Sequence, residues 1–84
     1  MNKKELISKI QKGDNVLIDY TKELLKFEDE EDLQEDETKK LALVLEVNED
    51  KIKFQDSSSP YPFEMTVKYL LNSELKLEVI ENIK

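Results

Sequence analysis

Residues 41–55, LALVLEVNEDKIKFQ, decide the fold class of this chain. The first half, up to residue 47, is apolar on both faces for most of its length, as is typical of a central and strongly curved strand. Residues 51–55 instead alternate with a period of two and direct Ile52 and Phe54 to one side. Residues 48–50 lack glycine but contain Asn and Asp, which tolerate a left-handed turn better than other residues do. The stretch therefore predicts a tight β-hairpin.

Strand patterns also occur before and after this hairpin. Residues 15–20 alternate, with Val16, Ile18 and Tyr20 on one face. Residues 63–67 and 75–79 repeat the alternation, so that Phe63, Met65 and Val67, and then Leu75, Leu77 and Val79, face the core. With the hairpin, these segments give about five short strands, the number typical of a small β domain.

The remaining segments predict two short helical pieces and several connections. Residues 1–12 contain one amphipathic helix, which we expect to end at Gly13, and residues 68–73 have the spacing of a short helical or 3₁₀ turn. Residues 21–38 form a long acidic loop after the first strand, and residues 56–62 form a shorter loop. The pattern predicts an all-β chain, residues 1–84, folded as a single small SH3-like barrel. A three-stranded sheet packed by one helix is the competing architecture.

The composition excludes several classes of chemistry. The chain has no His and no Cys, so zinc sites, haem ligands, disulfides and Ser-His-Asp or Cys-His relays are excluded. With one Gly it has no phosphate-binding glycine loop. A pair of carboxylates is the remaining catalytic option, but no spacing singles out such a pair. We therefore expect neither an enzyme nor a cofactor.

Charge is concentrated in one segment. The chain has 20 acidic residues and 13 basic ones, all of them Lys, and a net charge of −7. Residues 28–37 hold eight of the acids and no base, so the rest of the chain is close to neutral. The residues that we expect to make contacts in this run are Glu30, Glu31, Asp32, Glu35 and Asp36.

Three interpretations of this acidic run remain open. It is a solvated loop that keeps the chain soluble, or an arm for a basic partner that imitates the charge density of nucleic acid. Calcium binding is the third interpretation, although the spacing and the turn glycine of an EF-hand are missing.

Apolar and aromatic residues mark two further candidate contacts. Leu24, Phe27 and Leu33 lie beside or within the acidic run, and either hold the loop against the sheet as a lid or form an exposed patch for a partner. Tyr61 stands between Pro60 and Pro62, which stiffen the backbone around it. An aromatic side chain presented in this way suits an interface, although a plain connector with Tyr61 folded over the core is the alternative.

The lysines support a further alternative. Lys51 and Lys53 share the outward face of one predicted strand, and Lys68 and Lys76 join them only if the strand order allows it. Small barrels bind nucleic acid on such faces with the help of exposed aromatics, which these strands lack. Direct nucleic-acid binding is thus a less favoured interpretation.

Three stretches carry a resemblance to a known family. KGDNVLIDY at 12–20 looks like the opening strand of many SH3-like barrels. Together with TKKLALVLEVNEDKIKFQD at 38–56 and SPYPFEMTVKYLL at 59–71, it resembles the YorP family of bacilli and their temperate phages. The resemblance implies an SH3-like barrel and a phage or prophage setting, and carries over no activity and no site residue. VLIDY at 16–20 is also similar to the ALYDY segment of signalling SH3 domains, but the chain lacks the Trp that normally lines their polyproline groove.

These observations lead to one expected function. We expect a monomeric, cytoplasmic binding module that engages a protein partner, with contacts at Leu24, Phe27, the acidic run and Tyr61. An acidic charge mimic that inhibits a host nucleic-acid-binding protein is the second hypothesis, and direct nucleic-acid binding is the third.

Overall fold

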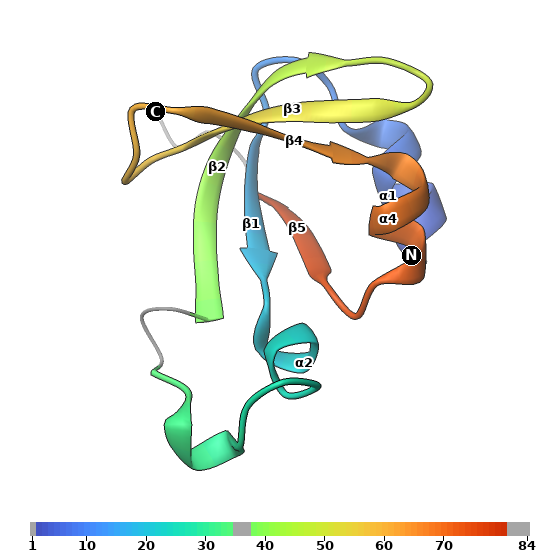
Figure 1. Ribbon diagram of the computed structural model, residues 1–84. Helices are drawn as coiled ribbons and strands as arrows, with labels where there is room; N and C mark the ends of the chain where they lie inside the picture. Colours follow the sequence, from blue (N-terminus) through green and yellow to red (C-terminus); the bar gives the residue numbers. More distant parts are fainter. Residues whose placement is uncertain (1, 35–37, 81–84) are drawn as a thin grey trace.

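A computed structural model describes residues 2–34 and 38–80 of the chain (Figure 1). Its elements, in chain order, are α1 (Lys3–Lys9), β1 (Asn15–Asp19), α2 (Thr21–Leu24), the 3₁₀ turn η1 (Glu30–Asp32), β2 (Lys39–Val47), β3 (Lys51–Asp56), β4 (Pro62–Thr66), α4 (Val67–Asn72) and β5 (Lys76–Ile80).

The five strands form one antiparallel sheet in the order β4-β3-β2-β1-β5. β2 is central, since it pairs with β1 through residues 39–43 and with β3 through residues 42–47. A register shift between Val44 and Glu46 bends β2, so that the sheet curls (Figure 1). The chain is thus a small, mostly β domain, consistent with a barrel-like fold, and the competing three-stranded architecture was wrong.

One face of the curled sheet forms the core. Val16 and Ile18 of β1, Ala42 and Val44 of β2, and Ile52 and Phe54 of β3 are all buried, as the period-two alternation predicts. Phe54 stacks on Phe63 of β4, with ring centroids 5.3 Å apart. The order of the sheet leaves β4 and β5 as its two edges, and α4 joins them in the chain. Leu70 of α4 is fully buried in the same core.

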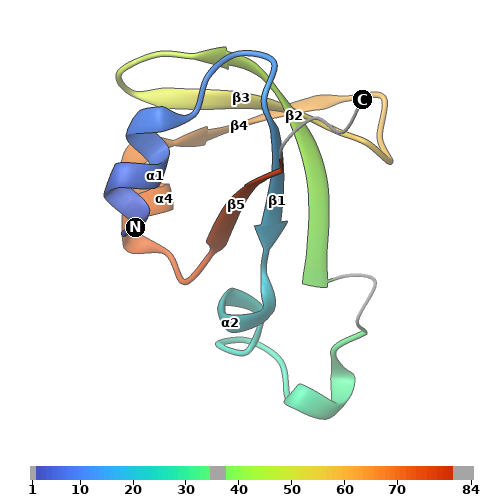
Figure 2. The same cartoon turned by 180° about the vertical axis from the view of Figure 1, so that it is seen from behind.

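Two helices lie side by side next to the sheet (Figure 1, Figure 2). The Asn2 side chain caps α1 by accepting a hydrogen bond from the Glu5 amide at 2.8 Å, and Thr66 caps α4 through the Tyr69 amide at 3.0 Å. The Lys3 ammonium joins the two helices by donating to the Ser73 carbonyl at 2.9 Å. This contact fixes α1 against the end of α4.

The boundaries of some elements differ from the sequence prediction. α1 ends at Lys9, four residues before Gly13, since the backbone of Ile10 is already extended and its side chain is buried in the core. Gly13 adopts φ +94° in the turn into β1, where its amide donates to the Val44 carbonyl at 2.8 Å. Val67, predicted in a strand, is the first residue of α4, and the loop predicted at 56–62 is shorter because Asp56 belongs to β3 and Pro62 to β4.

The central hairpin also differs in detail from its prediction. Leu41 and Leu43 of β2 are each about 40% exposed, so the second apolar face of this strand is only partly covered. No residue of the turn has a positive φ; among the described residues only Gly13, which lies elsewhere, has one. The Asn48 side chain instead accepts hydrogen bonds from the amides of Asp50 and Lys51, each at 2.9 Å. The turn therefore relies on side-chain hydrogen bonds and not on a left-handed residue.

Within the described residues, no helix is long and apolar enough to span a membrane.

Candidate functional site

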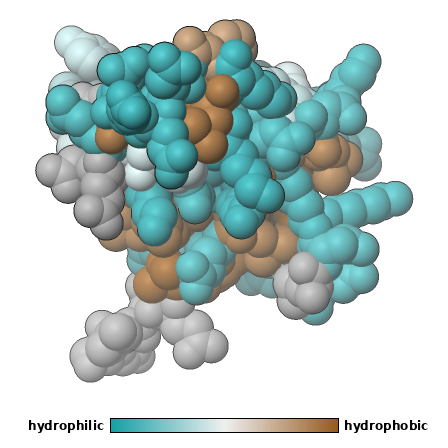
Figure 3. Space-filling model, turned by 90° about the horizontal axis from the view of Figure 1, so that it is seen from below, coloured by the Kyte–Doolittle hydropathy of each residue, from teal (hydrophilic) through white to brown (hydrophobic). Residues whose placement is uncertain are grey.

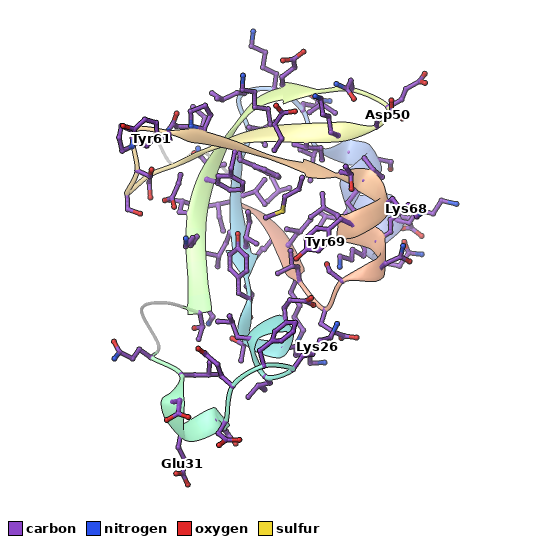
Figure 4. The ribbon with its side chains drawn as sticks, viewed as in Figure 1. Lys26, Glu31, Asp50, Tyr61, Lys68 and Tyr69 are labelled. Atoms are coloured by element: carbon purple, nitrogen blue, oxygen red, sulfur yellow. The ribbon has the colours of Figure 1, made fainter. Side chains whose placement is uncertain are left out.

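Tyr61 lies in the loop between β3 and β4 and is 77% exposed (Figure 4). Pro60 and Pro62 fix φ on either side of it, and its own amide donates to the Ser59 hydroxyl at 3.2 Å. The Gln55 side chain also donates to the Ser59 carbonyl. The backbone around this exposed ring is therefore held before any partner binds.

A pocket of about 360 Å³ opens beside Tyr61. Four strand ends meet there, because the sheet order places β4, β3, β2 and β1 next to one another. The pocket is lined by aromatic, polar and proline side chains, namely Tyr20, Lys40, Asp56, Ser59, Tyr61, Pro62 and Phe63. We call these seven residues the Tyr61 surface.

Lys40 connects the charged and the aromatic parts of this surface. Its ammonium lies 3.7 Å from a carboxylate oxygen of Asp56 and 5.9 Å from the centroid of the Tyr20 ring. A cation at this distance over an aromatic face is attracted to it. Lys40 thus bridges the end of β3 and the end of β1.

Asp56 and Tyr20 of the Tyr61 surface are both in their ordinary states at neutral pH. The Ser58 amide and hydroxyl both donate to Asp56 Oδ1 at 2.9 Å, and these bonds, with a smaller effect of Lys40, lower the pKa of the Asp56 carboxyl. Burial raises the pKa of Tyr20 to about 12, with smaller effects of Tyr69 and Asp56. Asp56 is therefore ionised and Tyr20 is protonated, so neither is adjusted for proton transfer near pH 7.

The described part of the acidic run, residues 28–34, lies away from Tyr61 (Figure 4). Glu30, Glu31 and Asp32 are exposed on η1, and Glu31 points away from the sheet at the far end of the molecule (Figure 4). The other two predicted contact residues, Glu35 and Asp36, lie outside the described residues. Among the residues that are described, no three carboxylates converge as metal ligands would.

The apolar residues beside the acidic run are divided between two environments. Leu24 and Leu33 are half-buried, whereas Phe27 is 81% exposed. The start of this loop is fixed, since the Glu23 carboxylate accepts a hydrogen bond from the Glu74 amide at 2.7 Å. On the side where α2 and η1 lie, apolar residues form separate small areas among hydrophilic ones (Figure 3). The loop after β1 is thus held against the rest of the chain at its start, while Phe27 within it is exposed.

The lysines of the sheet do not form one row. Lys51 pairs with Glu64 of β4 at 2.6 Å. Lys76 lies on β5, which β2 and β1 separate from β3 in the order of the sheet, and Lys68 lies on α4. The strand order therefore does not bring Lys68 and Lys76 next to Lys51 and Lys53 within the sheet, as a basic face would require.

The structure thus places the sequence-predicted residues in two separate regions. Tyr61 shares a pocket with Tyr20, Lys40 and Asp56, whereas Glu31 of η1 lies at the other end of the molecule from Tyr61 (Figure 4). Leu24 lies next to Tyr20, since its amide donates to the Tyr20 carbonyl at 2.9 Å, but neither Leu24 nor Phe27 lines the pocket. Sequence reasoning missed Lys40 and Asp56 as parts of the site. Lys40 directly precedes the predicted hairpin and Asp56 directly follows it, and this shared position was the signal in the sequence that could have placed them together.

No protein-family model matches this chain, and no curated protein or solved structure is significantly similar to it. The resemblance to the YorP family therefore stays a prediction.

Proposed function

We propose that this chain is a non-enzymatic binding module that engages a protein partner through the Tyr61 surface. The observation that carries this proposal is the 77% exposure of Tyr61 on a loop held by hydrogen bonds and flanked by two prolines. Tyr is enriched among the residues that dominate binding energy, because its ring buries a large area at little entropic cost. The pocket beside the ring offers an aromatic wall and a cation to the same partner.

We further propose that the module is an SH3-like barrel from a phage or prophage. The long connection between β1 and β2, the tight β2–β3 turn and the helix directly before β5 support this fold. The phage setting rests on the resemblance of residues 12–20, 38–56 and 59–71 to the YorP family.

The protonation states of the site support a binding role without catalysis. Burial raises the pKa of Tyr20 to about 12, and the hydrogen bonds from Ser58 lower the pKa of the Asp56 carboxyl. A general acid or base works best with a pKa near the operating pH. These two groups are therefore suited to structure and recognition.

A second candidate function uses the acidic run as a mimic of nucleic-acid charge. Glu30, Glu31 and Asp32 are exposed on one turn, and the three ion pairs among the described residues use other groups. These carboxylates are thus available to a basic partner. Such binding depends on long-range charge and weakens steeply as salt rises.

Affinity capture with matched variants tests both functions. Lysate of the cells that produce the chain is passed over the wild type, Tyr61→Ser, Phe27→Ser, and a variant with Glu30→Gln, Glu31→Gln and Asp32→Asn. We expect one captured protein that resists salt between about 0.1 and 1 M, is lost with Tyr61→Ser and is kept by the other two variants. Phe27→Ser is the control, because Phe27 is similarly exposed but does not line the pocket beside Tyr61.

Two results would contradict the primary proposal. Capture that survives Tyr61→Ser excludes the Tyr61 surface as the interface. Capture that is lost in high salt and on neutralisation of the three acids supports the charge mimic instead. A gel shift with mixed oligonucleotides in low salt tests direct nucleic-acid binding separately.

A further inference from the structure

A second concave surface lies between α1, α4 and the β2–β3 hairpin. Its volume is about 500 Å³, within the range typical of ligand-binding pockets. Five aliphatic side chains from all three elements line it, namely Ile7, Val47, Ile52, Val67 and Leu71. We call this surface the helix groove.

The helix groove is built from parts that are fixed to one another. Besides the contact of Lys3 with Ser73, the amide of Val67, at the start of α4, donates to the Asp50 carbonyl of the hairpin turn at 2.8 Å. Hydrogen bonds thus join the two helices to each other and α4 to the hairpin. A ligand would meet a groove that already exists.

Apolar surface in this groove remains open to solvent. Val47 is 39% exposed and Leu71 is 40% exposed, although both point into a concavity lined by further aliphatic residues. Scattered exposed aliphatics are ordinary, but a lined groove that contains them is typical of an interaction site. This surface is separate from the Tyr61 surface, because the Tyr61 loop precedes β4 and α4 follows it (Figure 1, Figure 4).

The rim of the helix groove carries opposite charges on its two sides. Lys4 lines it on α1, with Lys68 exposed on α4, while Glu49 lines it at the hairpin turn, next to the exposed Asp50. The three ion pairs among the described residues involve none of these four side chains. A complementary partner therefore places a base near the turn and an acid near the helices.

The backbone around the groove limits the conformation of its occupant. β3 is paired on both sides at Ile52, by Val47 and by Met65. β2 is paired with β1 only as far as Leu43, with two further hydrogen bonds at Val44, so its open edge beside the groove is residues 45–47, shorter than a usual strand of five to six residues and too short to hold an added strand. A segment buried there must satisfy its own backbone hydrogen bonds, as a helix does.

We propose that the helix groove binds an amphipathic helix of a partner protein. The helix presents bulky aliphatic or aromatic side chains at i, i+3 or i+4, and i+7 to Val47 and Leu71. It carries a basic residue facing Glu49 and an acidic residue facing Lys4.

A library selection on the full chain tests this proposal. A phage-displayed library of lactam-bridged helical peptides is selected on the wild type, and the enriched peptides are measured by fluorescence anisotropy. We expect a consensus with helical apolar spacing and a base at one end. Binding should fall at least about tenfold with Leu71→Asp and stay unchanged with Leu43→Asp. Leu43 is the matched control, because it is equally exposed but lies outside the groove.

A charge exchange provides a test that does not depend on the stability of the Leu71 variant. Glu49 is exposed on the turn, and Glu49→Lys should weaken the enriched peptides about tenfold while strengthening versions with their base changed to Glu. ¹⁵N-labelled wild type should show peptide-induced shifts at Ile7, Val47 and Leu71. The proposal is overturned if no helical consensus is enriched, or if enriched peptides bind Leu71→Asp and Glu49→Lys as they bind the wild type.

Discussion

Asp56 is a buried carboxylate that connects a loop, a strand and a lysine. One of its oxygens accepts both hydrogen bonds of Ser58, and the other faces Lys40. It is only 8% exposed. The loop that presents Tyr61 therefore begins at a side chain whose ionised form is stabilised by the fold.

The substitution Asp56→Asn should lower stability at neutral pH by about 1–2 kcal/mol, since it weakens charge-assisted hydrogen bonds. The pKa of Asp56 is lowered in the folded state, so its contribution is full above the unfolded value of about 3.9 and is lost as pH falls through the folded value. The difference between wild type and variant should therefore close in strong acid. Urea unfolding at neutral and at acidic pH measures it. Asp29→Asn is the control, since Asp29 makes no side-chain capping bond, and an equal loss there would refute the assignment.

Tyr20 gives a spectroscopic test of the same site. Its pKa is raised to about 12, chiefly by burial, so its phenolate forms late in an alkaline titration. Folding therefore gains from the neutral phenol below the unfolded value of about 10 and loses that gain as pH rises toward 12. Phenolate absorbance should show a step near pH 12 that Tyr20→Phe removes. Loss of an earlier step would show that the ring is not buried.

At the scale of elements, the β2–β3 turn depends on one side chain. Asn48 accepts two amide hydrogen bonds, at 2.9 Å each, in a turn without glycine. We expect Asn48→Ala to destabilise the chain by about 1 kcal/mol, while Asn48→Asp, which keeps an acceptor oxygen, costs much less. Thermal unfolding of the three proteins measures this. Equal losses would show that the bonds contribute nothing.

The alternation of the sequence was sufficient to locate the strands but not their surroundings. Val16, Ile18, Ile52 and Phe54 are buried as predicted, because period two fixes which side chains share a face. The apolar pattern of β2 did not reveal that its second face is only partly covered, since this depends on what lies across from it. Likewise, the sequence did not show that Gly13 belongs to a turn tied to Val44, since that contact is distant in sequence.

At the scale of the molecule, the acidic run should contribute little to stability. Glu30, Glu31 and Asp32 are exposed, and no tertiary hydrogen bond joins their side chains to the rest of the described chain. Changing them to Gln, Gln and Asn should therefore alter the free energy of unfolding by less than about 0.5 kcal/mol. Urea unfolding in low and high salt measures this. A larger loss would mean that the acids support the fold.

The sequence identified Tyr61, Phe27 and the acids as candidates, but not the two concave surfaces. Tyr61 was recognisable from its flanking prolines, which act locally. The Tyr61 surface depends on four strands meeting, and the helix groove depends on α1 meeting α4, more than 50 residues apart in the chain. No local pattern contains such contacts.

β4 is an edge strand of five residues with the Tyr61 surface at its start and the helix groove beyond its end. At roughly 3.3 Å per residue it acts as a stiff spacer of about 17 Å. A single ligand with two recognition elements that far apart would gain avidity, because binding at one end raises the effective concentration at the other. A ligand with a shorter linker could bind only one of the two surfaces at a time. The length of β4 therefore sets the minimum linker length of a bivalent partner.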